Sequence, residues 1–545
     1  MNAGPDDPLS DWLWLSPRSL IVRPVTDLIR LLPVLAGAAF FGSSRGSDSY
    51  WGFGFAAVAV VTSVVRWCTT RYRVTGERIY LRRGLLNQKV LSVPRDRIRS
   101  VDLSAHVVYR LLGLRKVMVG TGRNDRREGE SLHLDALRLP DAEALRAMLL
   151  TGPAVLAEPG AAGAAGAAGA AGAAGAAGRA GAAAAAEREL ARLAPAWVRF
   201  APLTLTGLVI VGVAIGSGTQ LIDATRINVT SIGPVHRLAI RFGALAPAQQ
   251  VLDGALVVLA CLVLLSVAGY VALFWNFRLV SPGSGVLRVS RGLLSTRTTT
   301  IDTRRLRGAE LSEPLLLRAA GGARCLAITT GLRVGRGAEH GGSLLLPPAP
   351  RAVASNVAAV VLGVPVEYLT GDLVRHGAAA RRRRYLRSAG PVAVLTAVLT
   401  LAWAVGHAPA WPWVASLAAL PLAAALAADR YRSLGHRLAG GWLITRTGSL
   451  VRRRSVLSTE GIIGWRIHQS WFQRRQGLVS LAATTAAGRQ HYVAHDIPAA
   501  VALAVAAAAT SDLMTPFLRG ADPPAAGRAA AAGVLPRPAL VRHLL

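Results

Sequence analysis

Six apolar segments, arranged as three pairs, constrain the fold of this chain more than any other feature. They cover residues 28–42 and 50–67, residues 202–217 and 251–275, and residues 391–405 and 411–427. A helix that crosses a bilayer needs about 20 largely apolar residues. The pattern therefore predicts three transmembrane helical hairpins. The third pair is rich in alanine, and a buried hairpin of a soluble domain is its alternative interpretation.

Charge is concentrated between these segments. The 545 residues include 62 basic and 30 acidic side chains, a net charge of +32, and nearly all the basic residues are arginines. Arginines flank the ends of each hairpin that point away from its connecting loop, and such ends are cytoplasmic by the positive-inside rule. Both termini and the large polar segments are then expected on the cytoplasmic side. The loop with Arg226, Arg237 and Arg241 goes against this orientation.

No pattern of residues indicates an enzyme. Cys68, Cys261 and Cys325 are far apart, which favours neither a disulfide framework nor a zinc site. His491 and His495 are four residues apart, but they fall at the end of an expected strand, where this spacing does not suit a metal ion. The chain has no glycine-rich phosphate loop. We expect no catalytic residues, no metal and no cofactor.

A repeat relates the segments that follow the three hairpins. When Gly84, Gly292 and Gly448 are aligned, apolar positions, glycines and arginines match without a gap over 38 residues. The aligned arginines include Arg110, Arg318 and Arg474. The spacing is 208 residues between the first two copies and 156 between the last two, and an Ala-Ala-Gly tract at 160–181 accounts for the difference. We expect this tract to be a flexible or weakly helical linker.

Each copy is predicted to be a small β-domain closed by a helix. In the first copy, short alternating stretches at 72–75, 78–82, 87–93, 98–104, 116–121 and 131–135 indicate strands. Proline and acidic residues then begin a helix over 140–150. Helices are expected at the same place in the other copies, over 350–362 and 498–508.

These motifs resemble the bacterial PH-domain family, the membrane-flanked domains of YdbS/YdbT-like proteins. The resemblance rests on Arg82-Arg83-Gly84-Leu85-Leu86, Ile98-Arg99-Ser100-Val101 and Arg110-Leu111-Leu112-Gly113-Leu114. It implies an α+β integral membrane protein of three tandem copies, each with a seven-stranded β-sandwich and a C-terminal capping helix. It also implies the bacterial plasma membrane as the location.

The expected domain boundaries follow from the hairpins and the copies. They are a cytoplasmic N-terminus at 1–27, hairpins at 28–68, 199–276 and 388–428, PH-like domains at 69–151, 277–365 and 429–512, an Ala/Gly-rich linker at 152–198, a basic linker at 366–387 and a C-terminal tail at 513–545.

Three arginine clusters are the predicted contacts for anionic head groups or partner proteins. They are Arg95, Arg97 and Arg99; Arg304, Arg305 and Arg307; and Arg452, Arg453 and Arg454. A solvated, topology-setting role is the alternative. Asp102 and Glu310 share one repeat position with Arg466, and we interpret this position as a solvated strand face.

The expected function is a non-enzymatic scaffold that is anchored in the bilayer and presents three cytoplasmic PH-like domains to anionic lipids or other membrane proteins. The alternative is a component of a membrane transport or export complex in which the spans are the working part. Nucleic acid is not an expected partner, because aromatic residues do not alternate with the arginine clusters.

Overall fold

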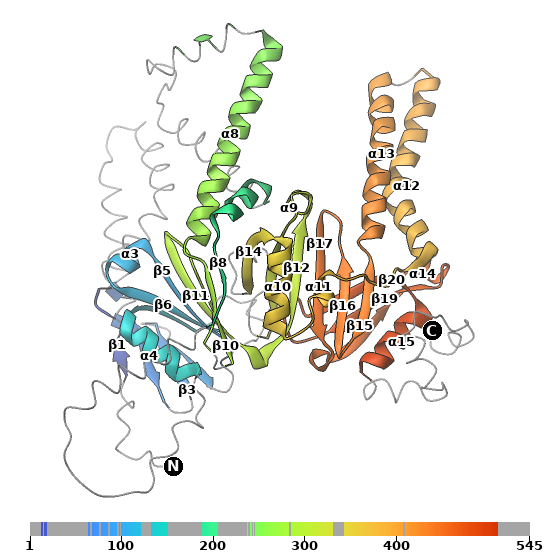
Figure 1. Ribbon diagram of the computed structural model, residues 1–545. Helices are drawn as coiled ribbons and strands as arrows, with labels where there is room; N and C mark the ends of the chain where they lie inside the picture. Colours follow the sequence, from blue (N-terminus) through green and yellow to red (C-terminus); the bar gives the residue numbers. More distant parts are fainter. Residues whose placement is uncertain are drawn as a thin grey trace, which may run out of the picture. The chain divides into compact units, whose positions relative to one another are not determined.

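The fold comes from a computed structural model, which describes, with short gaps, residues 12–18, 64–120, 132–150, 188–204, 237–330 and 343–510 (Figure 1). The chain divides into two compact units, residues 1–304 and 305–545. The boundary falls in the middle of the second sequence copy. The predicted domain at 277–365 is therefore divided between the two units.

The first unit contains two antiparallel sheets. The four-stranded sheet has the order β1 (Leu13–Trp14), β2 (Arg71–Val74), β3 (Arg78–Arg83) and β4 (Lys89–Pro94). The seven-stranded sheet has the order β7 (Leu132–Arg138), β6 (Leu114–Gly120), β5 (Ser100–His106), β11 (Ser295–Asp302), β10 (Val286–Arg291), β9 (Arg278–Ser281) and β8 (Arg188–Arg192). Helix α3 (Val107–Leu111) follows β5, and η3 (Pro195–Leu203) is a 3₁₀ helix.

The core of the first copy lies between its two groups of strands and a terminal helix. Ile79 from β3, Val101 from β5 and Leu134 from β7 are fully buried there. Helix α4 (Leu139–Leu150) covers this core with Ala142, Leu145 and Leu149. Strands that alternate in hydrophobicity, closed by a helix, are what the sequence predicts for this copy.

The second unit also contains two antiparallel sheets. The six-stranded sheet has the order β14 (Leu344–Pro350), β13 (Gly322–Thr329), β12 (Leu306–Pro314), β17 (Val451–Ser458), β16 (Trp442–Thr447) and β15 (Gly435–Ala439). The three-stranded sheet consists of β18 (Gly464–His468), β19 (Leu478–Thr484) and β20 (His491–Pro498). The shorter helices of this unit are α9 (Leu315–Ala319), α10 (Arg351–Leu362), α11 (Glu367–Thr370), α14 (Trp471–Arg474) and α15 (Ala499–Ala509), with 3₁₀ turns η5 (Thr303–Arg305, which spans the boundary between the units) and η6 (Thr459–Gly461).

Strand pairing joins each copy to the next. β5 of the first copy pairs with β11 of the second, and β12 of the second pairs with β17 of the third (Figure 1). In the first junction Leu103 lies opposite Thr298, and in the second Leu311 lies opposite Arg454. Leu103 and Leu311 share one repeat position, as do Thr298 and Arg454, so the two junctions have the same register. The copies are thus not independent sandwiches.

Equivalent ion pairs cross the two junctions. Arg297 Nη2 lies 2.6 Å from Asp102 Oδ2, and Arg453 Nε lies 3.4 Å from Glu310 Oε1. Arg297 and Arg453 occupy the same repeat position. Asp102 is 6% exposed and Glu310 3% exposed. The prediction of a solvated strand face here is wrong, because the next copy covers these two carboxylates and pairs with them.

The aligned arginines also cross the junctions. Arg110 Nη1 donates a hydrogen bond of 3.0 Å to the carbonyl oxygen of Leu293. Arg318 Nη1 donates one of 3.5 Å to the carbonyl oxygen of Ser449, which occupies the same repeat position as Leu293. The arginine that the sequence repeats is therefore used to hold the next copy.

Three helices of the described residues are long and apolar enough to cross a membrane: α8 (Pro247–Phe274), α12 (Gly377–Ala404) and α13 (Ala410–Arg432). α12 and α13 form a hairpin, with the rings of Trp403 and Trp413 stacked 5.0 Å apart near its turn. The prediction of six spans is thus supported for three. The span predicted at 28–42, all of the span at 50–67 except Val64 and Val65, and most of the span at 202–217 lie outside the described residues. The first residues of the latter end the 3₁₀ helix η3.

Two predicted linkers contain regular structure. β8, within the linker predicted at 152–198, pairs with β9 and extends the seven-stranded sheet. The basic linker predicted at 366–387 contains α11 and the first turns of α12. Its arginines therefore belong to the helix that continues into the predicted span.

One repeat position offers a test of the strand junctions. Gly308 and Gly464 share this position, but only Gly308 lies at a junction. A Cβ at Gly308 would collide with the carbonyl oxygen of Val456 across the junction, whereas a Cβ at Gly464 would meet nothing within 4 Å. Overpacking of this kind costs about 1–3 kcal/mol. We expect Gly308→Ala to lower the thermal unfolding temperature in detergent and the matched Gly464→Ala to leave it nearly unchanged. Equal unfolding temperatures for the two variants would contradict the β12–β17 junction.

Candidate functional site

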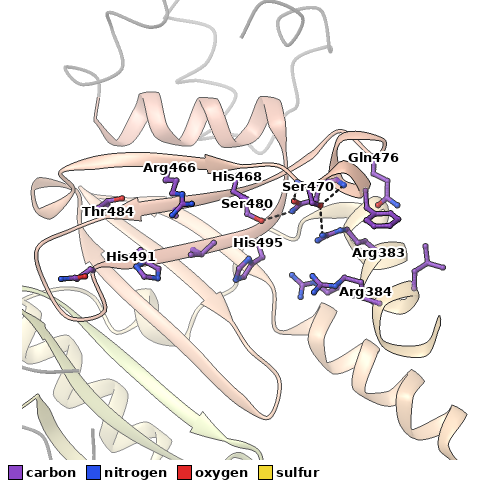
Figure 2. A pocket seen from close by; sticks show the side chains of 17 residues that line it. Arg383, Arg384, Arg466, His468, Ser470, Gln476, Ser480, Thr484, His491 and His495 are labelled. Atoms are coloured by element: carbon purple, nitrogen blue, oxygen red, sulfur yellow. Dashed lines mark hydrogen bonds between the residues drawn. The ribbon is translucent and has the colours of Figure 1, made fainter. Parts of the chain in front are cut away.

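The third copy contains a cavity of about 1370 Å³ at the base of helix α12 (Figure 2). Its floor is one face of the sheet β18-β19-β20, and α12 and α14 complete the wall. Its lining includes Arg383, Arg384, Leu386, Arg387, Arg466, His468, Ser470, Phe472, Gln473, Ser480, Thr484, His491 and His495.

The alternation of the three strands places polar side chains in the cavity. Arg466 and His468 on β18 and His491 on β20 point to one face of the sheet (Figure 2). On β19, Ser480 and Thr484 line the cavity. Their neighbours Leu481 and Ala483 are buried in the core on the opposite face of the sheet. Successive side chains of a strand point to opposite faces, so a strand pair with one apolar face presents the other to a ligand or solvent.

Asp496 fixes α12 to this sheet. The register between β19 and β20 shifts at this point, and Asp496 has a left-handed backbone with φ of 57°. Its carboxylate is fully buried, is hydrogen-bonded to the guanidinium of Arg383 and lies 2.6 Å from Arg384 Nη2. A β-bulge redirects a side chain in this way. The first turns of α12 are thus held against the third copy by two ion pairs to one buried acid.

A short helix completes this anchor. Gln473 Nε2 donates a hydrogen bond of 2.9 Å to Asp496 Oδ1, and Gln473 also forms a capping box with Ser470 at the start of α14. Arg383 Nη2 donates to Ser470 Oγ at 3.3 Å. The position of α14 therefore depends on the same buried carboxylate as the position of α12.

The cavity is basic once this pairing is taken into account. Asp496 is neutralised by Arg383 and Arg384, and its side chain lies behind the cavity lining. Arg387 and Arg466 remain exposed, together with His468 and His491. Burial, and then the charge of Arg384, lower the pKa of His495 and favour its neutral form. Two exposed arginines give this partly apolar cavity a positive charge.

Aromatic side chains lie beside the cavity. Phe472 on α14 is 66% exposed and Trp471 is 58% exposed, and the guanidinium of Arg475 lies 4.2 Å above the Trp471 ring. α14 lies near the point at which α12 leaves the sheet (Figure 1). Aromatic and arginine side chains at this level are typical of a membrane–water interface.

The predicted arginine clusters lie elsewhere. Arg95, Arg97 and Arg99 are outside the described residues. Arg304 is exposed, and its backbone N–H donates to Asp302 Oδ1. The carbonyl oxygen of Arg305 accepts a hydrogen bond from Thr329, and the methylenes of Arg307 lie against Gly461.

The third cluster makes contacts within its own unit. Arg454 is 3% exposed and donates to the carbonyl oxygens of Tyr368 and Gly371. Arg452 binds Asp429 at 3.2 Å, and Arg453 lies at the second junction as described above. Burial lowers the pKa of Arg454 to about 10. Because Arg454 is buried, its guanidinium is not accessible to a head group.

Sequence reasoning missed the cavity. In the sequence, Arg383, Arg384 and Arg387 stand before the third predicted hairpin, where arginines indicate a cytoplasmic end, and no pattern marks Asp496 as their partner. The pairing of Arg383 with Asp496 spans 113 residues, and nothing in the local pattern indicates it. Among the described residues, no group of three or more His, Cys, Asp or Glu side chains is placed to hold a metal ion.

Two regions of the chain match the bacterial PH domain family, residues 27–151 and 391–510. They contain the first and third sequence copies with the predicted spans before each, so these two regions are similar to bacterial PH domains. The chain also has helices that are long and apolar enough to span a membrane. The second copy lies outside the matched regions. Neither the curated proteins nor the solved structures compared with this chain include a match.

A pair of buried histidines lies next to the site. His376 Nδ1 is 2.7 Å from the carbonyl oxygen of His495, so it carries the proton that this acceptor requires. His376 Nε2 then accepts from His436 Nδ1 at 3.0 Å. Burial is the first cause that lowers both pKa values, to about 4 for His376 and about 3 for His436. Both rings are therefore neutral in the folded protein near pH 7.

These histidines make stability depend on pH. Between about pH 4 and the ordinary histidine pKa of 6.5, the unfolded chain binds protons at His376 and His436 and the folded chain does not. Stability from this pair is thus complete above pH 6.5 and falls on acidification, by up to about 1.4 kcal/mol per pH unit for each ring. We expect His436→Asn to reduce this slope of the unfolding temperature against pH. An unchanged slope in the variant would contradict the assignment to this pair.

Proposed function

We propose that this protein is a non-enzymatic scaffold of the bacterial plasma membrane, and that the cavity of its third copy binds an anionic lipid head group. In this proposal the PH-like domains and both termini are cytoplasmic. The observation that carries the proposal is the basic, partly apolar cavity at the base of α12, a helix with the length and composition of a membrane span.

Charge and position support a lipid as the ligand. Basic residues near an anionic leaflet contribute roughly 1 kcal/mol each to binding. Arg387 and Arg466 supply charge in the lining of the cavity, and Phe472 supplies an apolar contact there. A head group in the cavity would have its acyl chains directed along α12. A soluble anion has no apolar part that would contact the aromatic side chains of α14.

Anchoring by the spans would also strengthen the binding of lipid to the cavity. The spans hold the cavity at a fixed distance from the leaflet, which raises the effective concentration of lipid at a weak site. Two or three basic contacts are then sufficient for occupancy without the tight inositide recognition of a soluble domain. The proposed role is therefore a general preference for anionic lipid rather than the capture of one rare species.

Two arginines of the same helix provide a matched test. Arg387 lines the cavity, whereas Arg382 is exposed on α12 and does not line it. We expect Arg387→Glu to abolish the preference of the reconstituted protein for phosphatidylglycerol over phosphatidylcholine, measured by quenching of protein fluorescence with brominated lipids. Arg382→Glu should retain the preference, although it makes the same change in net charge.

Equal preference in both variants would overturn the lipid site. If, in addition, substitutions within α12 and α13 abolish the cellular role while cavity variants retain it, the alternative of a transport component takes precedence. Equal loss in both variants would mean that only the total charge of the helix matters, and it would also overturn a site in the cavity.

A further inference from the structure

One strand edge of the third copy has no partner in the sheets that the structure describes. The first and second copies each end in a group of three strands, and the first of these strands, β5 or β12, pairs with the next copy. In the third copy the equivalent strand is β18, which is the edge of the sheet β18-β19-β20. Edge strands expose backbone N–H and C=O groups that can pair with another strand.

β18 resembles the two junction strands in its side chains. Ile467 occupies the repeat position of Leu103 and Leu311. These leucines are 6% and 1% exposed at their junctions, whereas Ile467 is 40% exposed. All three strands have an apolar side chain at this position. In β18 this side chain is more exposed because no strand lies on the open edge of the sheet.

Two further junction features are present on the third copy. Gly464 occupies the position of Gly308, where a Cβ would collide with the backbone of the next copy, whereas Ser100 stands at this position in the first junction. At Gly464 nothing lies within 4 Å of the Cβ position. Arg474 occupies the position of Arg110 and Arg318, which both donate to the carbonyl oxygen of the next copy, and it is exposed.

The charge of β18 differs from that of the other two strands. Asp102 and Glu310 pair with Arg297 and Arg453 of the following copy. Arg466 stands at the position of these acids and is exposed. An incoming strand should therefore have a carboxylate where Arg297 and Arg453 stand.

A second copy of this chain does not fit this requirement. The strand of a second copy that stands at the repeat position of β11 and β17 is β4, an edge of its four-stranded sheet, and Lys89 there occupies the position of Arg297 and Arg453. Docking β4 of a second copy on β18 would bring a lysine toward Arg466. Like charges at neighbouring cross-strand positions are unfavourable.

We infer that β18 is a docking edge for a β-strand of another protein, which pairs antiparallel with it and has an aspartate or glutamate that binds Arg466. The register is that of the two internal junctions. The partner residue at the position of Val90 lies opposite Ile467, and the carboxylate stands one residue before it, at the position of Lys89. The inference concerns protein binding and does not rest on lipid binding, although Arg466 also lines the cavity.

The chain itself supplies a probe for this edge, because Lys89→Glu converts β4 into a strand of the required charge. Full-length chains of two sizes, both with Cys68→Ser and Cys261→Ser, are reconstituted together in liposomes. The longer chain has Ile467→Cys, and the shorter has Val90→Cys with either Lys89 or Lys89→Glu. Crosslinking with a short bis-thiol reagent is then measured.

We expect the Lys89→Glu chain to crosslink at least about fivefold more than the chain with Lys89, because a like-charge contact becomes an ion pair. The opposite exchange, Arg466→Glu in the longer chain against Lys89 in the shorter, should restore crosslinking to a similar level. Ile463→Cys, which is also exposed just before β18, should crosslink to position 90 much less than Ile467→Cys does.

Each contrary result overturns a part of the inference. Equal crosslinking with Lys89 and Glu at position 89 would remove the requirement for a carboxylate and make a second copy the partner. Stronger crosslinking from position 463 than from position 467 would contradict the register. Absence of crosslinking in every combination would show that β18 is not a docking edge. None of these results depends on the preference for phosphatidylglycerol, so the two proposals can fail separately.

Discussion

The hydrogen bonds between strands of neighbouring copies are the interaction on which the rest of the structure depends. A domain of this size buries little apolar surface, and its sheets have open edges. Pairing β5 with β11 and β12 with β17 closes these edges and buries Asp102 and Glu310 beside their arginine partners. The compact units consequently divide the chain in the second copy and not between copies.

The same principle connects the membrane helices to the sheets. α12 continues from its arginine-rich first turns into the apolar segment, and Asp496 pairs with Arg383 and Arg384 on those turns. α13 ends at Arg432, a few residues before β15 begins. The lining of the cavity includes side chains from both the helix and the strands.

The sequence predicts the local elements well and the long-range contacts poorly. Gly84, Gly292 and Gly448 were aligned because they repeat, and they share a left-handed backbone with φ of 105°, 111° and 98° that favours glycine at a turn. Strand positions and terminal helices follow from alternation and helix-start signals. The partner of a strand edge does not, since β5 and β11 are separated by almost 200 residues. The interpretation of Asp102 and Glu310 failed for this reason: their environment is set by another copy.

Amide hydrogen exchange of the full-length protein in liposomes tests the shared sheets most directly. If neighbouring copies are joined by strand pairing, the amides of β11 and β17 should exchange as slowly as those of the adjacent central strands β10 and β16. β18 should exchange faster than β5 and β12, although the three strands occupy the same position in the repeat. Fast exchange throughout β11 and β17, at the rate of an exposed edge, would contradict the junctions and would mean that each copy folds as a separate domain.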